Sequence, residues 1–167
     1  LKDILKAKRQ RRGAIDFDLP EADIHLDGNG RAVGVSLHIR GEANMMIEEF
    51  MLSANETVAR EGVDKGLPLM YRVHEAPDPE RIKELNTFLH TLGYGVGNAE
   101  KVQPADVRKM LLKAAGSSEE RVINNVTLRA MTKAKYSPDC DGHFGLAAKY
   151  YCHFTSPIRR YPDLLVH

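Results

Sequence analysis

The sequence predicts a mixed α+β fold in which a β-hairpin or small sheet packs with several helices. Two alternating apolar runs flank Gly28-Asn29-Gly30, which is a strong hairpin signal. Apolar residues then recur at helical spacing between residues 43 and 61, and shorter helical patterns follow that begin at proline or serine. A chain of 167 residues with 43% hydrophobic content has room for one domain with one core.

The first part of the chain is predicted to form a helix followed by strands. Residues 1–12 have the pattern of the end of a basic helix. Alternating residue types predict a half-buried strand over 14–18, a second strand over 22–27 and a return strand over 31–39. A long helix over 43–61 should follow. Its core-facing stripe is expected to be Ile47, Phe50, Met51, Ala54 and Val58.

The middle of the chain contains clear helix end signals. A short strand is expected over 69–73. The next helix should start at Pro79, where a proline fits the first turn, and end at Gly93. Another helix should run from Pro104 to Gly116 for the same reasons.

The last third mixes helix and strand signals. Ser117 and Glu120 have the spacing of a capping box, which predicts that a helix starts there. Residues 150–155 have the composition of a buried strand. The final helix could begin at Ser156 or only at Pro162, because proline has no N–H to donate inside a helix.

Charge and cysteine content set limits on the class of protein. The net charge of +1 does not by itself indicate a nucleic-acid-binding protein, although the basic residues are clustered. Cys140 and Cys152 form neither a disulfide framework nor a CxxC motif, so we interpret them as reduced thiols in a cytoplasmic protein. No apolar run approaches the roughly 20 residues needed to cross a bilayer, so no membrane partner is expected.

Two adjacent glutamates on the long helix are predicted to face different surroundings. Helical spacing places Glu49 on a solvated stripe with Glu56, which is expected to pair with Arg60. Glu48 should lie at the edge of the core with Asn55 on the same stripe. Two interpretations of Glu48 are open: an ordinary polar seam, or a carboxylate that accepts hydrogen bonds from a ligand hydroxyl such as a ribose 2′-OH.

The segment near the C-terminus is dense in groups that bind nucleotides. It combines hydroxyls, guanidiniums and aromatic rings, which suit phosphates and bases. These residues are Phe154, Thr155, Ser156, Arg159, Arg160 and Tyr161. If Ser156 caps a helix, backbone N–H groups there would also attract an anion. The alternative is a capped helix start with solvated arginines.

Signals for a metal site are weak. The seven histidines show no HxH or HxxxH spacing, so a zinc site is not expected. Asp16 with Asp18, and Asp139 with Asp141, could each hold a cation, but solvated carboxylates are the favoured explanation, because an aspartate on the solvent side of an edge strand needs no metal. No GxGxxG or Walker phosphate-binding loop is present.

The motifs together resemble those of a known family. Residues 153–167 read HFTSPIRRYPDLLVH, which resembles the signature segment of the ribonuclease II/ribonuclease R catalytic domain. The segments at 12–18, 47–55 and 71–78 resemble other parts of that domain, in the same order. The resemblance therefore spans essentially the whole chain, and the segment at 12–18 favours the ribonuclease R branch.

The resemblance implies a processive 3′-to-5′ exoribonuclease that uses Mg²⁺ to release nucleoside 5′-monophosphates from single-stranded RNA. It implies that Arg159 contacts the reacting phosphate. Glu48 would lie near the terminal sugar and help to select RNA over DNA, and Phe17 would clamp the stacked bases. The remaining residues that the resemblance assigns to the RNA 3′-end site are Thr155, Ser156, Arg160 and Tyr161.

The chain also departs from the family pattern. It lacks the aspartate-rich segment that binds the metal, and it lacks cold-shock and S1 domains. Residues 1–167 are therefore expected to be the C-terminal half of the catalytic domain, inactive alone and prone to self-association through exposed core. The alternative is a non-catalytic RNA-binding or scaffold relative. A complete metal-independent enzyme has little support, because no nucleophile–base pair is visible.

Overall fold

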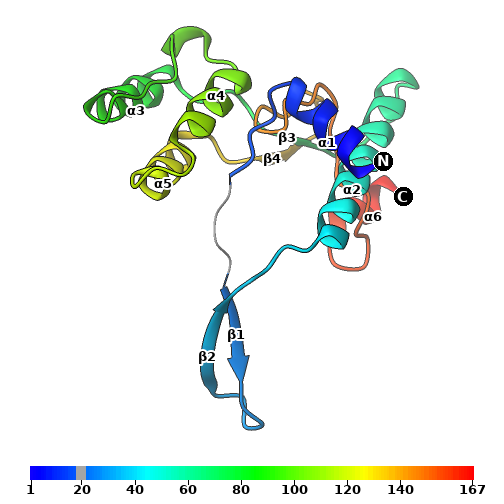
Figure 1. The fold of residues 1–167 in the computed structure, drawn as a ribbon. Coiled ribbons are helices and arrows are strands. Elements are labelled where there is room, and N and C mark those ends of the chain that lie inside the picture. The colour runs from blue at the N-terminus through cyan, green and yellow to red at the C-terminus, as the bar shows by residue number, and fades with distance from the viewer. Residues whose placement is uncertain (18–21) are drawn as a thin grey trace.

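The computed structural model describes residues 1–17 and 22–167. Its elements form the expected mixed α+β fold (Figure 1). In chain order they are α1 (Lys2–Arg11), β1 (Ala22–Leu26), β2 (Ala32–Leu37), α2 (Glu42–Asp64), β3 (Tyr71–Val73), α3 (Pro79–Thr91), η1 (Ala99–Lys101), α4 (Pro104–Ala114), α5 (Glu120–Ala130), β4 (Lys135–Ser137) and α6 (Tyr161–Val166).

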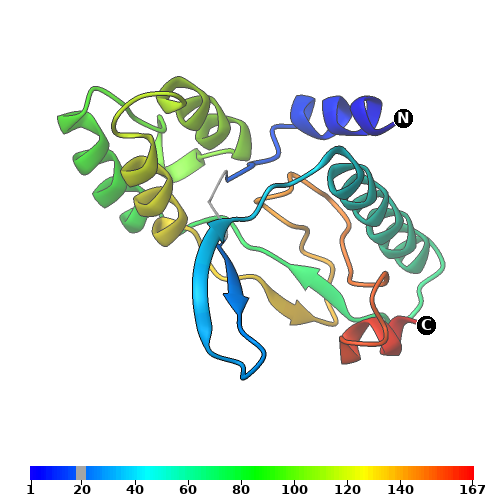
Figure 2. The ribbon, with the colours of Figure 1, turned by 60° about the horizontal axis from the view of Figure 1, so that its bottom comes forward.

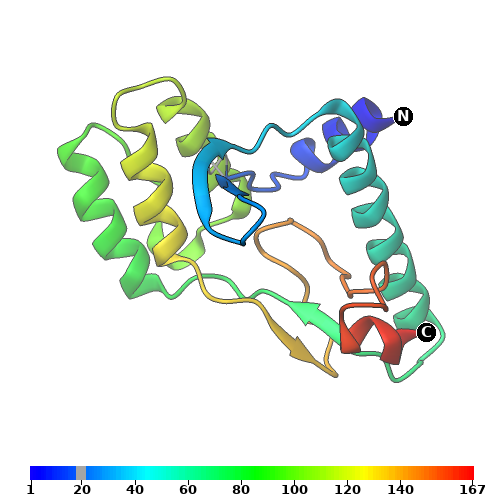
Figure 3. The same ribbon diagram turned by 90° about the horizontal axis from the view of Figure 1, so that it is seen from below.

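The helices gather in two groups. Helices α3, α4 and α5 form one lobe, and α1, α2 and α6 lie on the other side of the molecule (Figures 1 and 3). The short sheet of β3 and β4 runs between them, and α6 lies beside the C-terminal end of α2 (Figures 2 and 3). The proposed site therefore has a wall that includes a rigid, 23-residue helix.

The lobe of α3, α4 and α5 contains the larger core. Ile82, Leu89 and Ile123 are completely buried there. The expected start of α3 is confirmed, because the Asp78 side chain accepts a hydrogen bond from the Glu80 N–H. Helices α3 and α4 both start at the prolines where the sequence predicted them.

Helix α5 starts later than the capping-box spacing predicted. It begins at Glu120, and the Glu120 carboxylate accepts a hydrogen bond from the Gly116 N–H at 2.7 Å. The chain around Gly116 has a positive φ of 78° and turns sharply, so the acidic side chain reaches back past Ser117. The N-cap predicted at Ser117 is therefore wrong by two residues, because Glu119 is the N-cap.

A smaller core lies under α2. Tyr71, Val73 and Cys152 are buried together with Ala59 of α2. The strand expected over 150–155 is reduced to a single bridge between Tyr71 and Cys152. The ladder does not continue, because the Asn55 side chain takes the Phe154 N–H that a longer strand would use.

The first two strands form the expected hairpin, which projects from the body (Figure 1). Ile24 pairs directly with Val35, and their side chains are 63% and 70% exposed. Apolar residues of this hairpin are thus exposed, and whether they cause the expected self-association stays a prediction.

The strand expected over 14–18 is wrong where it can be judged. Residues 14–17 form no strand, and Asp18 lies outside the described residues. Ala14 and Ile15 are both buried although they are neighbours, which a half-buried strand does not allow. The Ile15 N–H donates to the Gly145 carbonyl at 2.8 Å, and this bond fixes the segment instead.

The expected core stripe of α2 is also wrong. Ile47 is 50% exposed and Phe50 is 36% exposed. The buried residues of α2 are Glu49, Asn55, Ala59 and Gly62. Two polar residues are buried because each has a partner: Glu49 accepts from Arg9 of α1, and Asn55 bonds to Tyr151 and Phe154.

Candidate functional site

A cavity of about 290 Å³ brings together residues that are distant in the sequence. Glu48 of α2 lines it, as do Thr155, Arg159 and Arg160 from the chain before α6. The other residues in its lining include Arg9, Asp16, Arg40, Asn55 and Tyr151. Four of the side chains that the sequence singled out therefore share one space.

The remaining predicted residues lie elsewhere. Phe17 is half-buried against the larger core. Tyr161 is 69% exposed, and neither it nor Ser156 is part of the cavity lining. The structure thus separates the sequence-predicted set into a central group and three outlying residues.

The two glutamates of α2 have opposite surroundings from those predicted. The side chain of Glu49 is only 6% exposed, and its Oε1 accepts a hydrogen bond from Arg9 Nη2 at 2.7 Å. Glu48 is 39% exposed at the cavity and is paired with Arg40. The prediction failed because it placed α2 against apolar neighbours, whereas α1 offers guanidinium groups that compensate a buried carboxylate.

A second ion pair joins the same two helices. Arg12 donates two hydrogen bonds of 2.6 Å to the Glu56 carboxylate. The pair of Glu56 with Arg60 predicted from helical spacing is therefore wrong. Arg9 of α1 and Arg12, the residue directly after α1, thus both pair with carboxylates of α2.

Asn55 joins α2 to the segment that carries Thr155. Its Nδ2 donates to the Tyr151 hydroxyl at 3.2 Å, and its Oδ1 accepts from the Phe154 N–H at 3.1 Å. The Cys152 thiol lies 3.4 Å from the Asn55 carbonyl oxygen and donates to it. Sequence reasoning placed Asn55 near Glu48 but gave it no role, because its partners lie almost 100 positions away.

Asp163 holds the turn that presents the arginines. It is completely buried, and its Oδ1 accepts hydrogen bonds of 2.7 Å from the Ser156 N–H and from Arg160 Nη2. Burial alone would raise the pKa of this carboxyl, but these two hydrogen bonds outweigh it and keep the pKa below its usual value. The Ser156 N–H is thus used within the protein.

The start of α6 decides between the two possibilities left open for this helix. It begins at Tyr161, with Pro162 in its first turn, and not at Ser156. The expected anion site at a helix capped by Ser156 is therefore wrong. Arg159 is exposed on the preceding turn, and no hydrogen bond or ion pair engages its side chain within residues 1–17 and 22–167.

Neutral rings pack behind Tyr151. The His143 ring lies 5.2 Å from the Tyr151 ring and the His153 ring lies 5.9 Å from it, both edge-to-face. Burial is the main cause that lowers the pKa of His143 to about 3 and that of His153 to about 4. Both rings are therefore uncharged at neutral pH and support Tyr151 by packing.

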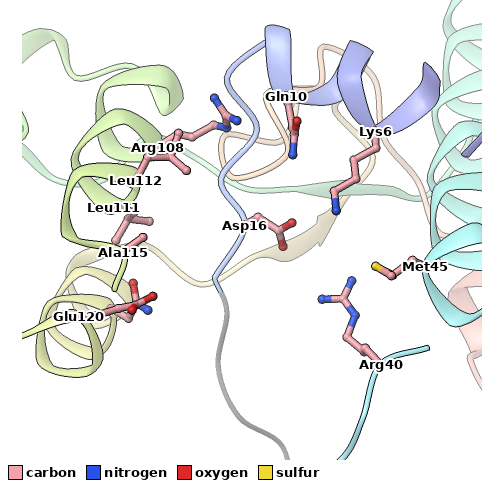
Figure 4. A pocket seen from close by; sticks show the side chains of 11 residues that line it. Lys6, Gln10, Asp16, Arg40, Met45, Arg108, Leu111, Leu112, Ala115 and Glu120 are labelled. Carbon is pink, nitrogen blue, oxygen red and sulfur yellow. The ribbon is translucent and has the colours of Figure 1, made fainter. Parts of the chain in front are cut away.

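A second cavity, of about 400 Å³, adjoins the first. The two share Asp16 and Arg40 in their linings. Figure 4 shows Lys6, Asp16 and Arg40 pointing into the same space, with Arg108 and apolar residues of α4 on the opposite side. Cationic groups beside an apolar wall suit a nucleotide, whose phosphate and base need different surroundings.

The described residues do not fit the metal that the resemblance implies. Residues 1–17 and 22–167 contain no cluster of three or more histidine, cysteine, aspartate or glutamate side chains that could bind an ion. Asp139 and Asp141 therefore lack a third ligand, and the pair of Asp16 with Asp18 falls partly outside the described residues. Among the described helices, none has both the length and the apolar character to cross a membrane.

Comparisons with known proteins agree with the motifs. Ribonuclease R of Aquifex aeolicus is 48% identical over 164 residues, which are 98% of this chain and 23% of that protein. RNase R of Mycoplasma genitalium, solved in complex with ribose-methylated single-stranded RNA, is similar with a TM-score of 0.93 and 31% identity, over 99% of this chain and 26% of that one.

A third relative has a different character. Yeast Ssd1, described as a pseudonuclease, is similar with a TM-score of 0.65 and 26% identity, over 77% of this chain and 16% of that one. Measured against the ribonuclease R of Aquifex aeolicus, the chain spans about a quarter of that protein's length. The model of the RNB domain matches residues 1–167. The chain therefore belongs to the RNB-domain family.

Proposed function

We propose that the whole protein is a 3′-to-5′ exoribonuclease that degrades single-stranded RNA processively to nucleoside 5′-monophosphates. In this proposal the chain is the C-terminal half of the catalytic domain and forms the binding wall for the RNA 3′ end. The supporting observation is the shared cavity of Glu48, Thr155 and Arg159. Ribonuclease R relatives support the same reaction class.

The proposed roles follow from the exposure and chemistry of each side chain. Arg159 is exposed at the cavity, and its planar guanidinium can donate two hydrogen bonds to the reacting phosphate. Such a contact accelerates hydrolysis when it strengthens as charge develops in the transition state. Glu48 can accept a hydrogen bond from the terminal 2′-OH, which DNA lacks.

The remaining residues would hold the strand. Thr155 and Arg160 lie in the same cavity as Arg159, so they would contact the terminal nucleotide. The adjoining cavity with Lys6 and Arg108 would take the preceding nucleotide. Phe17 follows Asp16, which lines both cavities, and its half-buried ring would stack on a base of the strand. Ser156 and Tyr161 would contribute at the rim.

Metal dependence belongs to the whole protein in this proposal. The family implies Mg²⁺, and the described residues offer no cluster to hold it. We therefore assign no hydrolytic step to these residues alone, and the isolated chain should release no monophosphates. The pair of free cysteines agrees with a cytoplasmic location.

The experiment uses the whole protein and 5′-labelled single-stranded RNA with Mg²⁺. The wild type should shorten RNA from the 3′ end and release monophosphates. Arg159→Lys keeps the charge but loses the fork, so turnover should fall about tenfold or more while RNA affinity stays nearly unchanged. Arg60→Lys, an exposed change elsewhere on α2, is the control.

A second candidate is a non-catalytic RNA-binding protein. The similarity to the pseudonuclease Ssd1 favours it. RNA binding without monophosphate release by the whole wild-type protein, at any Mg²⁺ or Mn²⁺ concentration, would decide for this candidate.

A further inference from the structure

Glu48 and Arg159 reach the cavity from segments far apart in the sequence. Glu48 is carried by α2, whereas Arg159 follows the irregular segment before α6. No backbone ladder joins α2 to that segment, since helix backbone groups bond within the helix. Side-chain contacts must therefore set the separation of the two residues.

Asn55 provides hydrogen bonds between α2 and this segment. It lies two turns after Glu48 on the same face of α2, and it is 3% exposed. Its side-chain amide bonds to Tyr151 and Phe154, and its main-chain carbonyl oxygen accepts from Cys152, as described above. Thr155 is the residue directly after one of these partners, so its position depends on this amide.

The chemistry of the partners requires an amide or a close mimic. The Phe154 N–H needs an acceptor, and the Tyr151 hydroxyl accepts a hydrogen bond from the Asn55 amide. Leucine has nearly the same size but offers neither group, and a buried N–H without a partner is destabilising. The segment would then shift to find other partners.

We propose that Asn55 is a positioning residue that sets the distance between Glu48 and the Thr155–Arg159 segment. The proposal rests on the proposed function for its choice of substrate. Asn55 touches neither phosphate nor sugar in this account. It affects RNA binding through the positions of Glu48 and Arg159, which do contact the sugar and the phosphate.

The test uses the whole protein and two readouts. The first is binding of an oligoribonucleotide against the same oligomer with a 3′-terminal 2′-deoxyribose, measured by fluorescence anisotropy in EDTA. The second is the release of monophosphates with Mg²⁺. The variants are Asn55→Leu and Asn55→Asp. Asp still accepts from the Phe154 N–H and can accept from the Tyr151 hydroxyl.

The matched control is Asn86→Leu. Asn86 is a half-buried amide that, like Asn55, both accepts and donates a hydrogen bond: it accepts from the Val96 N–H at 2.8 Å and donates to the Gly97 carbonyl at 3.0 Å. It lies on α3 and lines neither cavity of the candidate site. It therefore reports the cost of losing such an amide without disturbing the site.

Asn55→Leu should abolish the preference for a terminal ribose and lower kcat about a hundredfold, because a misplacement of about 1 Å can cost that much. Asn55→Asp should recover part of both, and Asn86→Leu should lower Tm while keeping both. If Asn55→Leu does not fold, Asn55→Ser, which is too short to reach both partners, should show the same losses.

Two outcomes would overturn the inference. One is a wild-type ribose preference in a folded Asn55→Leu or Asn55→Ser variant whose Tm falls like that of Asn86→Leu. The other is a wild-type protein without any ribose preference. A wild type that prefers ribose but releases no monophosphates would refute the exoribonuclease proposal alone, and loss of that preference in Asn55→Leu would still support the positioning role.

Discussion

Adjacent residues of this chain carry different tasks, as Glu48 and Glu49 illustrate. The Glu49 carboxylate is buried and bonded to Arg9, whereas Glu48 faces a cavity and is paired with Arg40. Burial makes the first pair structural, because an unpaired buried charge is costly. Exposure leaves the second free to exchange its partner for a ligand.

This difference predicts opposite effects of two alanine substitutions. Glu49→Ala removes the hydrogen-bonded partner of the buried Arg9 guanidinium, which keeps only its 3.7 Å ion pair with Asp16, so the free energy of unfolding should fall by about 3 kcal/mol. Glu48→Ala removes a solvent-exposed pair and should cost less than about 1 kcal/mol. Urea unfolding measures both. In the whole protein, Glu48→Ala should also abolish the preference for a terminal ribose. If a folded Glu49→Ala protein loses this preference and Glu48→Ala keeps it, then Glu49 and not Glu48 contacts the sugar.

Phe17 packs against the larger core, but its proposed role is to stack on an RNA base. Its ring is half-buried against the larger core, and so is that of Phe144. In the whole protein, Phe17→Ala should change the length of the final RNA product more than the rate of release, since base stacking on a ring is worth about 1–3 kcal/mol. Phe144→Ala is the matched control and should leave the product length unchanged. If both variants give the same product ladder as the wild type, Phe17 does not clamp the bases.

At the scale of the elements, the sequence predicted where helices lie better than which face they bury. The limits of α3 and α4 follow from prolines, glycines and apolar spacing. The buried face of α2 could not be found this way, because counting apolar residues assumes that burial requires apolar side chains. Arg9 and Arg12 arrive from another helix, and only the tertiary structure shows which carboxylates they neutralise.

The hairpin of β1 and β2 should cause self-association of the isolated chain. Ile24 and Val35 form a directly opposed, exposed apolar pair on one face. Replacing both with threonine keeps strand propensity but removes apolar surface. Sedimentation velocity should show association for the wild type and a monomer for the double variant. Ser36→Thr on the other face is the control, and unchanged association in the double variant would place the contact elsewhere.

The ring cluster behind Tyr151 should make stability depend on pH. The folded-state pKa of His143 is about 3, below the usual value of about 6.5 for a histidine in an unfolded chain. Between these values the unfolded chain binds the proton and the folded chain does not, so the free energy of unfolding should decrease as pH falls from about 6.5 to about 3. Urea unfolding at several pH values gives the free energy of unfolding as a function of pH. This dependence should be shallower for His143→Gln than for the wild type and unchanged for the exposed His90→Gln. Equal slopes for wild type and His143→Gln would contradict the cause assigned here.

At the scale of the whole molecule, the candidate site could be predicted in composition but not in geometry. The segment at 153–167 and Glu48 were both identified in the sequence, and the structure brings Thr155, Arg159 and Arg160 of that segment to one cavity with Glu48. Asn55, Arg40 and Tyr151 were given no role, because their contacts join segments that no local pattern relates. The second cavity was unforeseen for the same reason.

The central claim is that the cavity of Glu48 and Arg159 receives the RNA 3′ end. A crystal structure of the whole protein with an RNA whose terminal linkage resists hydrolysis tests it most directly. The account predicts the terminal 2′-OH within hydrogen-bond distance of Glu48, the adjoining phosphate against Arg159, and the preceding nucleotide towards Lys6 and Arg108. A 3′ end bound outside this cavity, with Glu48 still paired to Arg40, would contradict it.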